Sequence, residues 1–191
     1  MIIKRTCVVT ILAVLLAALP LSSFAQEREQ SAAAAKPAKR KLNDITGAWL
    51  FTLTISDAAA AADLPLAARR FVRAAATQPS FDGTETFNED GTFAENSLSD
   101  YLPPVGTPGR GEWIKTGDHE FALTFYGVLF VSFDNPTVIG TYKVRSKITL
   151  GASGTTFSAP AVIDIFDPAG NLLVTLSADV QGRRAVVEPL P

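Results

Sequence analysis

The stretch from Glu120 to Val180 constrains the fold more than any other part of this 191-residue sequence. It holds four long runs of alternating apolar and polar residues, separated by short segments rich in Gly, Asn, Asp or Pro. The apolar residues that share one face of each run are Phe121, Leu123, Phe125, Leu129, Val131 and Phe133; Val138, Tyr142, Val144, Ile148 and Leu150; Phe157, Ala159, Ala161, Ile163 and Ile165; and Leu172, Val174, Leu176, Ala178 and Val180. Alternation with a period of two is typical of half-buried antiparallel strands. The sequence therefore predicts an all-β domain.

Shorter runs before Glu120 bring the predicted strands to eight. They span Ile45–Ile55, Ser80–Asn88, Thr92–Leu98 and Arg110–Thr116. Asp90-Gly91 indicates a β-hairpin between the second and third of these, and the proline-rich segment Ser99–Gly109 indicates a loop. Eight strands suffice to close an up-and-down sheet around side chains or one small ligand. We therefore expect an eight-stranded antiparallel up-and-down β-barrel, with an open meander or a two-sheet sandwich as the alternative.

The segment Asp57–Gln78 breaks the strand pattern. It is rich in alanine, and Asp63 followed by Pro65 is typical of the start of a helix. An apolar stripe at helical spacing follows, made of Leu64, Ala68, Phe71, Val72 and Ala75. The sequence predicts a short helical insert after the first strand, covering one end of the barrel.

The N-terminal residues resemble a targeting segment rather than part of the fold. A basic start (Lys4 and Arg5), the apolar run Val8–Leu21 and the small residues Ser23 and Ala25 predict a signal peptide over residues 1–25. The apolar run is too short for a comfortable membrane span. Residues 26–43 then form a predicted flexible leader, and residues 44–191 the barrel domain. We expect a periplasmic or secreted protein with no membrane span.

The composition argues against several function classes. Cys7 is the single cysteine and lies in the predicted signal peptide, while His119 is the single histidine. The formal net charge of −2 gives no electrostatic reason to bind nucleic acid. We find no Ser-His-Asp or Cys-His pattern, phosphate loop or metal-ligand spacing in the sequence. The sequence therefore names no catalytic residue, metal site or cofactor.

Gly47-Ala48-Trp49 at the head of the first strand resembles the Gly-x-Trp signature of the calycin barrels, which include the lipocalins, fatty-acid-binding proteins and avidins. The resemblance implies that Trp49 closes one end of the barrel and that an arginine near the end of the last strand, Arg184 or its neighbour Arg183, packs across its ring. The layout over Ile45–Glu188 is also similar to the barrels of allene oxide cyclase type. The Thr-Asp-Tyr pattern of typical lipocalins is replaced in this chain by Asp134-Asn135-Pro136.

Glu85 and Glu95 are the first candidates for a site. They flank the Asp90-Gly91 turn at equal distance, on the same alternation face as the phenylalanines of these two strands. If that face points inward, two carboxyl groups meet inside the barrel and shift each other's pKa. The alternative is that both are solvated at the barrel mouth.

Further candidates are polar or aromatic residues on the inward face. We expect Trp113, Tyr142 and Ser146 to orient a ligand in a cavity that is also lined by Phe87, Phe93 and Phe125. The alternative for the first three is ordinary core, with the Tyr142 hydroxyl bonded to the backbone.

These features lead to one expected function and two rivals. The expected function is binding of a small apolar molecule in the cup of the barrel. One rival is a cyclase- or isomerase-like enzyme in which Glu85 or Glu95 polarises the substrate. The other is a structural barrel that self-associates through Tyr126, Val128 and Phe130, three apolar residues on the predicted outer face.

Overall fold

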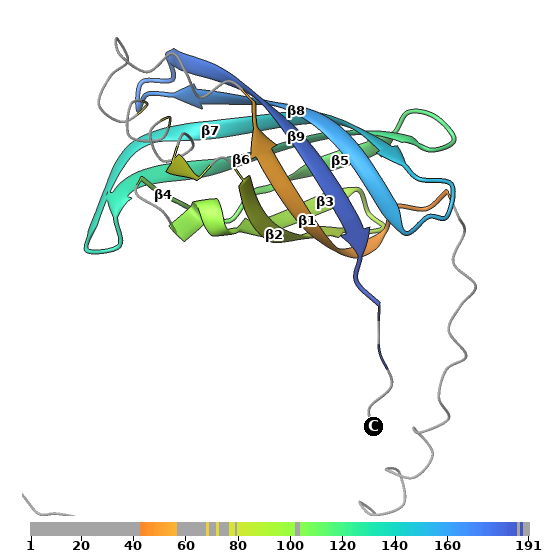
Figure 1. Cartoon of the computed structure of the whole chain (residues 1–191). Coiled ribbons are helices and arrows are strands. Elements are labelled where there is room, and N and C mark those ends of the chain that lie inside the picture. Colours follow the sequence, from red (N-terminus) through yellow and green to blue (C-terminus); the bar gives the residue numbers. More distant parts are fainter. Residues whose placement is uncertain are drawn as a thin grey trace, which may run out of the picture. The chain divides into compact units, whose positions relative to one another are not determined.

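The computed structural model of the chain (Figure 1) describes residues 43–56, 68, 72, 77–78, 80–101, 104–186 and 188. All of them fall within one unit, Arg40–Pro191. In chain order these residues form β1 (Gly47–Ile55), β2 (Ser80–Phe87), β3 (Thr92–Ser97), the 3-10 helix η1 (Leu98–Tyr101), β4 (Val105–Gly106), β5 (Arg110–Lys115), β6 (Glu120–Ser132), β7 (Asn135–Leu150), β8 (Thr156–Phe166) and β9 (Leu172–Arg184).

The strands form one closed antiparallel sheet. Its order is β4-β6-β5-β3-β2-β1-β9-β8-β7, and β7 pairs with β6 so that the sheet returns on itself. The first and last long strands, β1 and β9, pair from Trp49↔Arg184 to Ile55↔Ala178. Each of the eight principal strands therefore has a partner on both sides, which removes the exposed edges of an open sheet. The predicted eight-stranded antiparallel barrel is confirmed, and the sandwich alternative is wrong.

Strict up-and-down order is wrong, because β4 is an additional short strand outside the series of eight. It pairs with β6 through Val105↔Phe130 and Gly106↔Leu129, beyond the point where β5 pairs with β6 at Arg110↔Tyr126. The segment predicted as a plain loop, Ser99–Gly109, thus contains part of η1 and all of β4. A two-residue strand is too short to show as alternation in a sequence.

The far end of the β6–β7 hairpin also departs from the predicted alternation. The pattern predicts that Phe133 and Val138 face inward, yet they are 63% and 51% exposed. The β6–β7 register shifts between Leu129 and Phe130 and again before Ser132. A one-residue shift exchanges the two faces of a strand, so the inward set ends at Leu129 on β6.

Two predictions fall mainly outside the described residues. The signal peptide over residues 1–25 and the leader over residues 26–43 lie there almost completely, and they remain predictions. Of the insert Asp57–Gln78, the described residues Ala68, Val72 and Thr77 have helical backbone, and the side chains of Ala68 and Val72 are buried. These positions do not define a helix, so the helical insert also remains a prediction. No helix among the described residues is long and apolar enough to cross a membrane.

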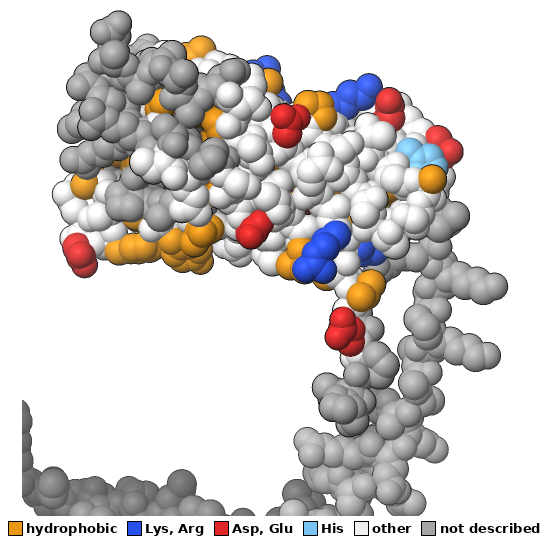
Figure 2. Space-filling model, in the orientation of Figure 1, with side chains coloured by type: hydrophobic (Ala, Val, Ile, Leu, Met, Phe, Trp, Pro, Cys, Tyr) orange, Lys and Arg blue, Asp and Glu red, His pale blue; other side chains and the backbone are white. Residues whose placement is uncertain are grey.

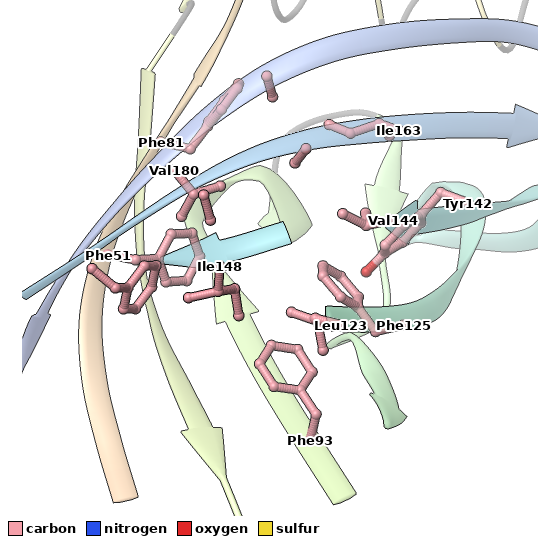
Figure 3. Packing of buried hydrophobic residues seen from close by; sticks show 14 of the residues in the cluster. Phe51, Phe81, Phe93, Leu123, Phe125, Tyr142, Val144, Ile148, Ile163 and Val180 are labelled. Carbon is pink, nitrogen blue, oxygen red and sulfur yellow. The ribbon is translucent and has the colours of Figure 1, made fainter. Parts of the chain in front are cut away.

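The barrel interior is filled mainly by aromatic and aliphatic side chains from all the principal strands. Figure 3 shows these side chains converging, with Phe125 and Tyr142 close together. The ring centres of these two residues are 6.4 Å apart. Inward-facing glycines make room for the largest rings. Gly182 on β9 pairs with Phe157 on β8 and lies directly against the Phe157 ring. A side chain at residue 182 would occupy the space that this ring fills.

We expect Gly182→Ala to lower the free energy of unfolding by about 1–3 kcal/mol, because the added methyl group would overlap the Phe157 ring. Urea denaturation followed by circular dichroism measures the change. Gly117→Ala is the matched control, since a Cβ there would meet its nearest neighbour, the Glu120 side chain, at 3.2 Å. Equal unfolding midpoints for the two variants would contradict the packing of Phe157 against Gly182.

Candidate ligand-binding site

One end of the barrel is plugged by aromatic rings. Trp49 contacts Phe157 with ring centres 5.1 Å apart, and Phe87 contacts Phe93 at 5.0 Å. Trp113 lies against Phe87 and against Phe121 on β6, and its indole Nε1 donates to the Asn88 carbonyl at 3.1 Å. Such edge-to-face contacts stabilise a core beyond simple burial. The structure therefore places three of the candidate ligand contacts, Phe87, Phe93 and Trp113, in this plug, and none of the three lines the two interior cavities described below.

Arg184 holds the plugged end closed. Its guanidinium lies 4.2 Å from the Trp49 ring centre, while Arg183 is exposed. Nε donates to the Gly154 carbonyl at 2.9 Å, and the two terminal nitrogens donate to the carbonyls of Thr46 and Asp44. Trp49 Nε1 donates in turn to the Ile45 carbonyl at 2.8 Å. The buried Arg184 side chain therefore connects the segment before β1 to the turn between β7 and β8. Its position across the Trp49 ring is the contact that the calycin resemblance implies.

Glu85 and Glu95 face the barrel interior side by side. They are direct partners in the β2–β3 ladder, and each is 5% exposed. Glu95 Oε2 accepts from the Gly109 backbone N–H at 3.2 Å. Glu85 Oε2 is buried and has no hydrogen-bond partner among the described residues. The alternative of two solvated acids at the barrel mouth is therefore wrong.

Burial changes the protonation of these acids. Desolvation, with a smaller contribution from the Glu95 charge, raises the pKa of Glu85 from 4.5 to about 8. Desolvation and the charge of Asp100 raise the pKa of Glu95 to about 7, and desolvation raises the pKa of Asp100 to about 6. The cluster of these three carboxyls therefore holds protons near neutral pH.

Two small interior cavities adjoin this carboxyl cluster. A cavity of about 20 Å³ is lined by both glutamates together with Phe125 and Ser146, among others. A second cavity of about 50 Å³ has four polar residues on its wall, Glu95, Ser97, Asp100 and Tyr142, and its other side chains are apolar. These volumes are those open to the centre of a water-sized sphere, and about 10–15 Å³ of such volume holds one water molecule. The larger cavity therefore takes an occupant of about four non-hydrogen atoms. Glu95 lies on the wall of both cavities.

Tyr142 and Ser146 both line cavities while bonding to the backbone. The Tyr142 hydroxyl donates to the Thr107 carbonyl at 2.8 Å, and burial raises the pKa of this tyrosine. Ser146 Oγ donates to the Pro160 carbonyl at 3.1 Å. Both hydroxyl protons are therefore engaged, and what each residue can offer an occupant is its oxygen as an acceptor or, for Tyr142, its ring.

Asp100 lines the larger cavity, and the sequence alone does not predict this position. It lies in η1, and its Oδ2 accepts from the Ser97 backbone N–H at 2.9 Å, which turns the chain back over the barrel end. The proline-rich context indicates a loop, and nothing in the sequence shows that this loop returns to the interior. The Ser97-x-x-Asp100 spacing, typical of a local side-chain to backbone turn, is the one available signal.

The outer surface carries two further features. An open groove of about 740 Å³ runs over β1, β2, β8 and β9, and its outward side chains are mostly polar, including Thr52, Asp82 and Arg183. Hydrophobic side chains gather at the end of the barrel where the β6–β7 hairpin lies (Figure 2). On the outer face of β6, Tyr126 is 53% exposed, whereas Val128 and Phe130 are half-buried. Self-association through these three residues remains a prediction.

Comparisons of the chain with protein-family models, with curated proteins and with solved structures give no match. The calycin resemblance therefore depends on Gly47, Trp49 and the packing of Arg184 alone.

Proposed function

We propose that this barrel binds a small, largely apolar molecule in the 50 Å³ cavity, with one polar group directed at Glu95, Asp100 and Tyr142. The observation that carries the proposal is the convergence of these polar side chains on an interior cavity whose remaining side chains are apolar. Apolar cavities with a few polar groups, and with acids of strongly shifted pKa, are typical of small-molecule sites.

Two other expectations support this proposal and form part of it. The calycin barrels bind ligands inside the cup, and the interior cavity lies where such a ligand would sit. The predicted signal peptide would direct the protein to the periplasm or outside the cell, where it would meet small molecules from the surroundings. The cavity volume limits the occupant to a compact molecule, so long lipid chains are outside this proposal.

A cavity-filling variant tests the proposal. In Gly106→Ala the new Cβ would lie 3.2 Å from Asp100 Oδ1 and 3.6 Å from Tyr142 Cε1, so it takes space from the cavity and requires a small shift of the Asp100 carboxyl. Native mass spectrometry of protein purified from its own host is expected to show a bound small molecule on the wild type and on the control Gly117→Ala, and less of it on Gly106→Ala. Equal occupancy of the two variants would place the ligand elsewhere, and an empty wild type would contradict binding.

A second candidate function is favoured by one observation. The pKa values of Glu95 and Glu85, about 7 and about 8, suit groups that exchange protons with a substrate near neutral pH. In an isomerase-like barrel, Glu95→Gln would abolish turnover of the bound molecule and leave binding intact. In the binding protein that we propose, the bound molecule is recovered unchanged after incubation with the wild type.

Self-association is tested by light scattering. If Tyr126, Val128 and Phe130 pack between copies, the molecular mass measured by light scattering should rise with protein concentration. Tyr126→Lys should reduce that rise, because it places a charge among these apolar side chains. A mass that stays at that of one chain over the whole concentration range would exclude this contact.

A further inference from the structure

Building on the proposed function, we propose that the polar group of the bound molecule is a protonated amine, held by Glu95 and Asp100 on the wall of the 50 Å³ cavity, with Glu85 beside Glu95 in the adjoining cavity. The ligand class is thus a compact alkylamine. The carboxyls come from three elements, β2, β3 and η1, and all three side chains are buried.

The charged side chains that line the two cavities are all acidic. The described residues that line the two cavities include three acids and no lysine, arginine or histidine. The titratable groups that face the cluster from neighbouring strands are Tyr142 on β7 and Arg110 on β5. Arg110 is exposed, and its Nη1 donates to the Gly109 carbonyl. Buried carboxylates need either a proton or a cation, and a ligand that carries its own cation meets this need.

The unpartnered oxygen of Glu85 also favours an ammonium group. Glu85 Oε2 lies in the interior with no hydrogen-bond partner in the described part of the chain, next to a cavity that Glu95 also lines. A primary ammonium has three donors and no acceptor, which matches a wall of carboxyl oxygens. An alcohol has one donor, and a carboxylate ligand would meet like charges. A metal ion is not the alternative, because no group of His, Cys, Asp and Glu among the described residues is arranged to hold one.

The rest of the cavity wall suits a short alkyl group. Side chains that can surround such a group are Leu53, Ile55, Phe81, Phe125, Leu129 and Ile163. The ring of Tyr142 also lines this space, and an ammonium over an aromatic ring gains a further attraction.

Because the carboxyl cluster holds protons near neutral pH, a bound cation lowers the pKa values of these acids. Binding of the amine is therefore expected to release protons.

Isothermal titration calorimetry at pH 7 with n-propylamine, 1-propanol and propionate tests the proposal. We expect propylamine to bind about tenfold or more tightly than propanol. The reason is that the ammonium group forms charge-assisted hydrogen bonds to the carboxyls, whereas the propanol hydroxyl is neutral. Propionate should not bind. The heat of propylamine binding should depend on the ionisation enthalpy of the buffer, which reports proton release.

Variants and outcomes separate this inference from the proposed function. Glu95→Gln, and independently Glu85→Gln, should remove most of the preference for propylamine over propanol, measured as the ratio of the two affinities in the same variant. The control is Glu112→Gln, an exposed glutamate on β5, which should behave as the wild type. If propanol binds as tightly as propylamine, or if both cavity variants keep the preference, the amine inference is overturned and the proposed function stands. If none of the three probes binds, the proposed function itself is overturned.

Discussion

Arg184→Ala is expected to lower the free energy of unfolding by about 3–5 kcal/mol, the largest loss that we predict for a single substitution. The truncation leaves the carbonyls of Gly154, Thr46 and Asp44 without this donor, and it uncovers the Trp49 ring. Trp49 and Arg184 are direct partners in the β1–β9 ladder, so closure of the barrel is weakened together with local packing. Chemical denaturation of the purified protein measures the loss.

Arg183→Ala is the matched control, because Arg183 is the neighbouring arginine on the outer face and is exposed. It should change the free energy of unfolding by about 0.5 kcal/mol or less. Arg184→Lys should recover only part of the loss, since a lysine cannot supply a planar fork of donors to several carbonyls. If alanine at residue 184 costs no more than alanine at residue 183, Arg184 does not hold the barrel closed.

Glu85→Gln is expected to stabilise the protein at alkaline pH, by about 2–4 kcal/mol at pH 8 and above. The folded state raises the pKa of Glu85 from 4.5 to about 8. Below pH 4.5 both the folded and the unfolded states keep the proton, and the two proteins differ little. As the pH rises from 4.5 to about 8 the unfolded state ionises first, so the wild type loses stability relative to the variant. Above about 8 the folded state ionises as well, and the difference stays constant.

Urea unfolding at a series of pH values measures this effect. Glu112→Gln, the exposed control, should follow the wild type at every pH. A Glu85→Gln variant whose advantage does not grow between pH 4.5 and 8 would show that Glu85 is ionised at ordinary pH in the folded barrel. The buried, unpartnered carboxyl that the ligand proposals require would then not exist.

Much of the barrel was predictable because its long strands have one buried face. The alternation of β6 to β9 indicates which residues face inward, and it is correct for most positions from Phe121 to Leu129 and from Tyr142 to Leu150. It fails at Phe133 and Val138, where the β6–β7 register shifts, and at Leu172, which is 56% exposed next to a shift in the β8–β9 register. A sequence does not show how two strands are paired. The strand β4 was missed for a related reason: two residues carry no periodicity.

The candidate site was predictable only in part. The Asp90-Gly91 turn fixes the hairpin register, so the pairing of Glu85 with Glu95 followed from counting outward from that turn. Inward direction alone does not distinguish a cavity from a plug, however. Phe87, Phe93 and Trp113 point inward as expected, yet they pack against one another at the closed end. Asp100 reaches the cavity through a turn of the chain that local sequence does not reveal.

A ¹³C NMR titration of the Glu85 and Glu95 side-chain carboxyls decides whether the closed barrel encloses an acidic cavity. We predict that the Glu85 carboxyl carbon titrates with a pKa of about 8 and the Glu95 carbon with a pKa of about 7, both displaced when n-propylamine is added. Two carboxyls that titrate near 4.5, unaffected by the amine, would show that both groups are solvated, and no acidic cavity would exist.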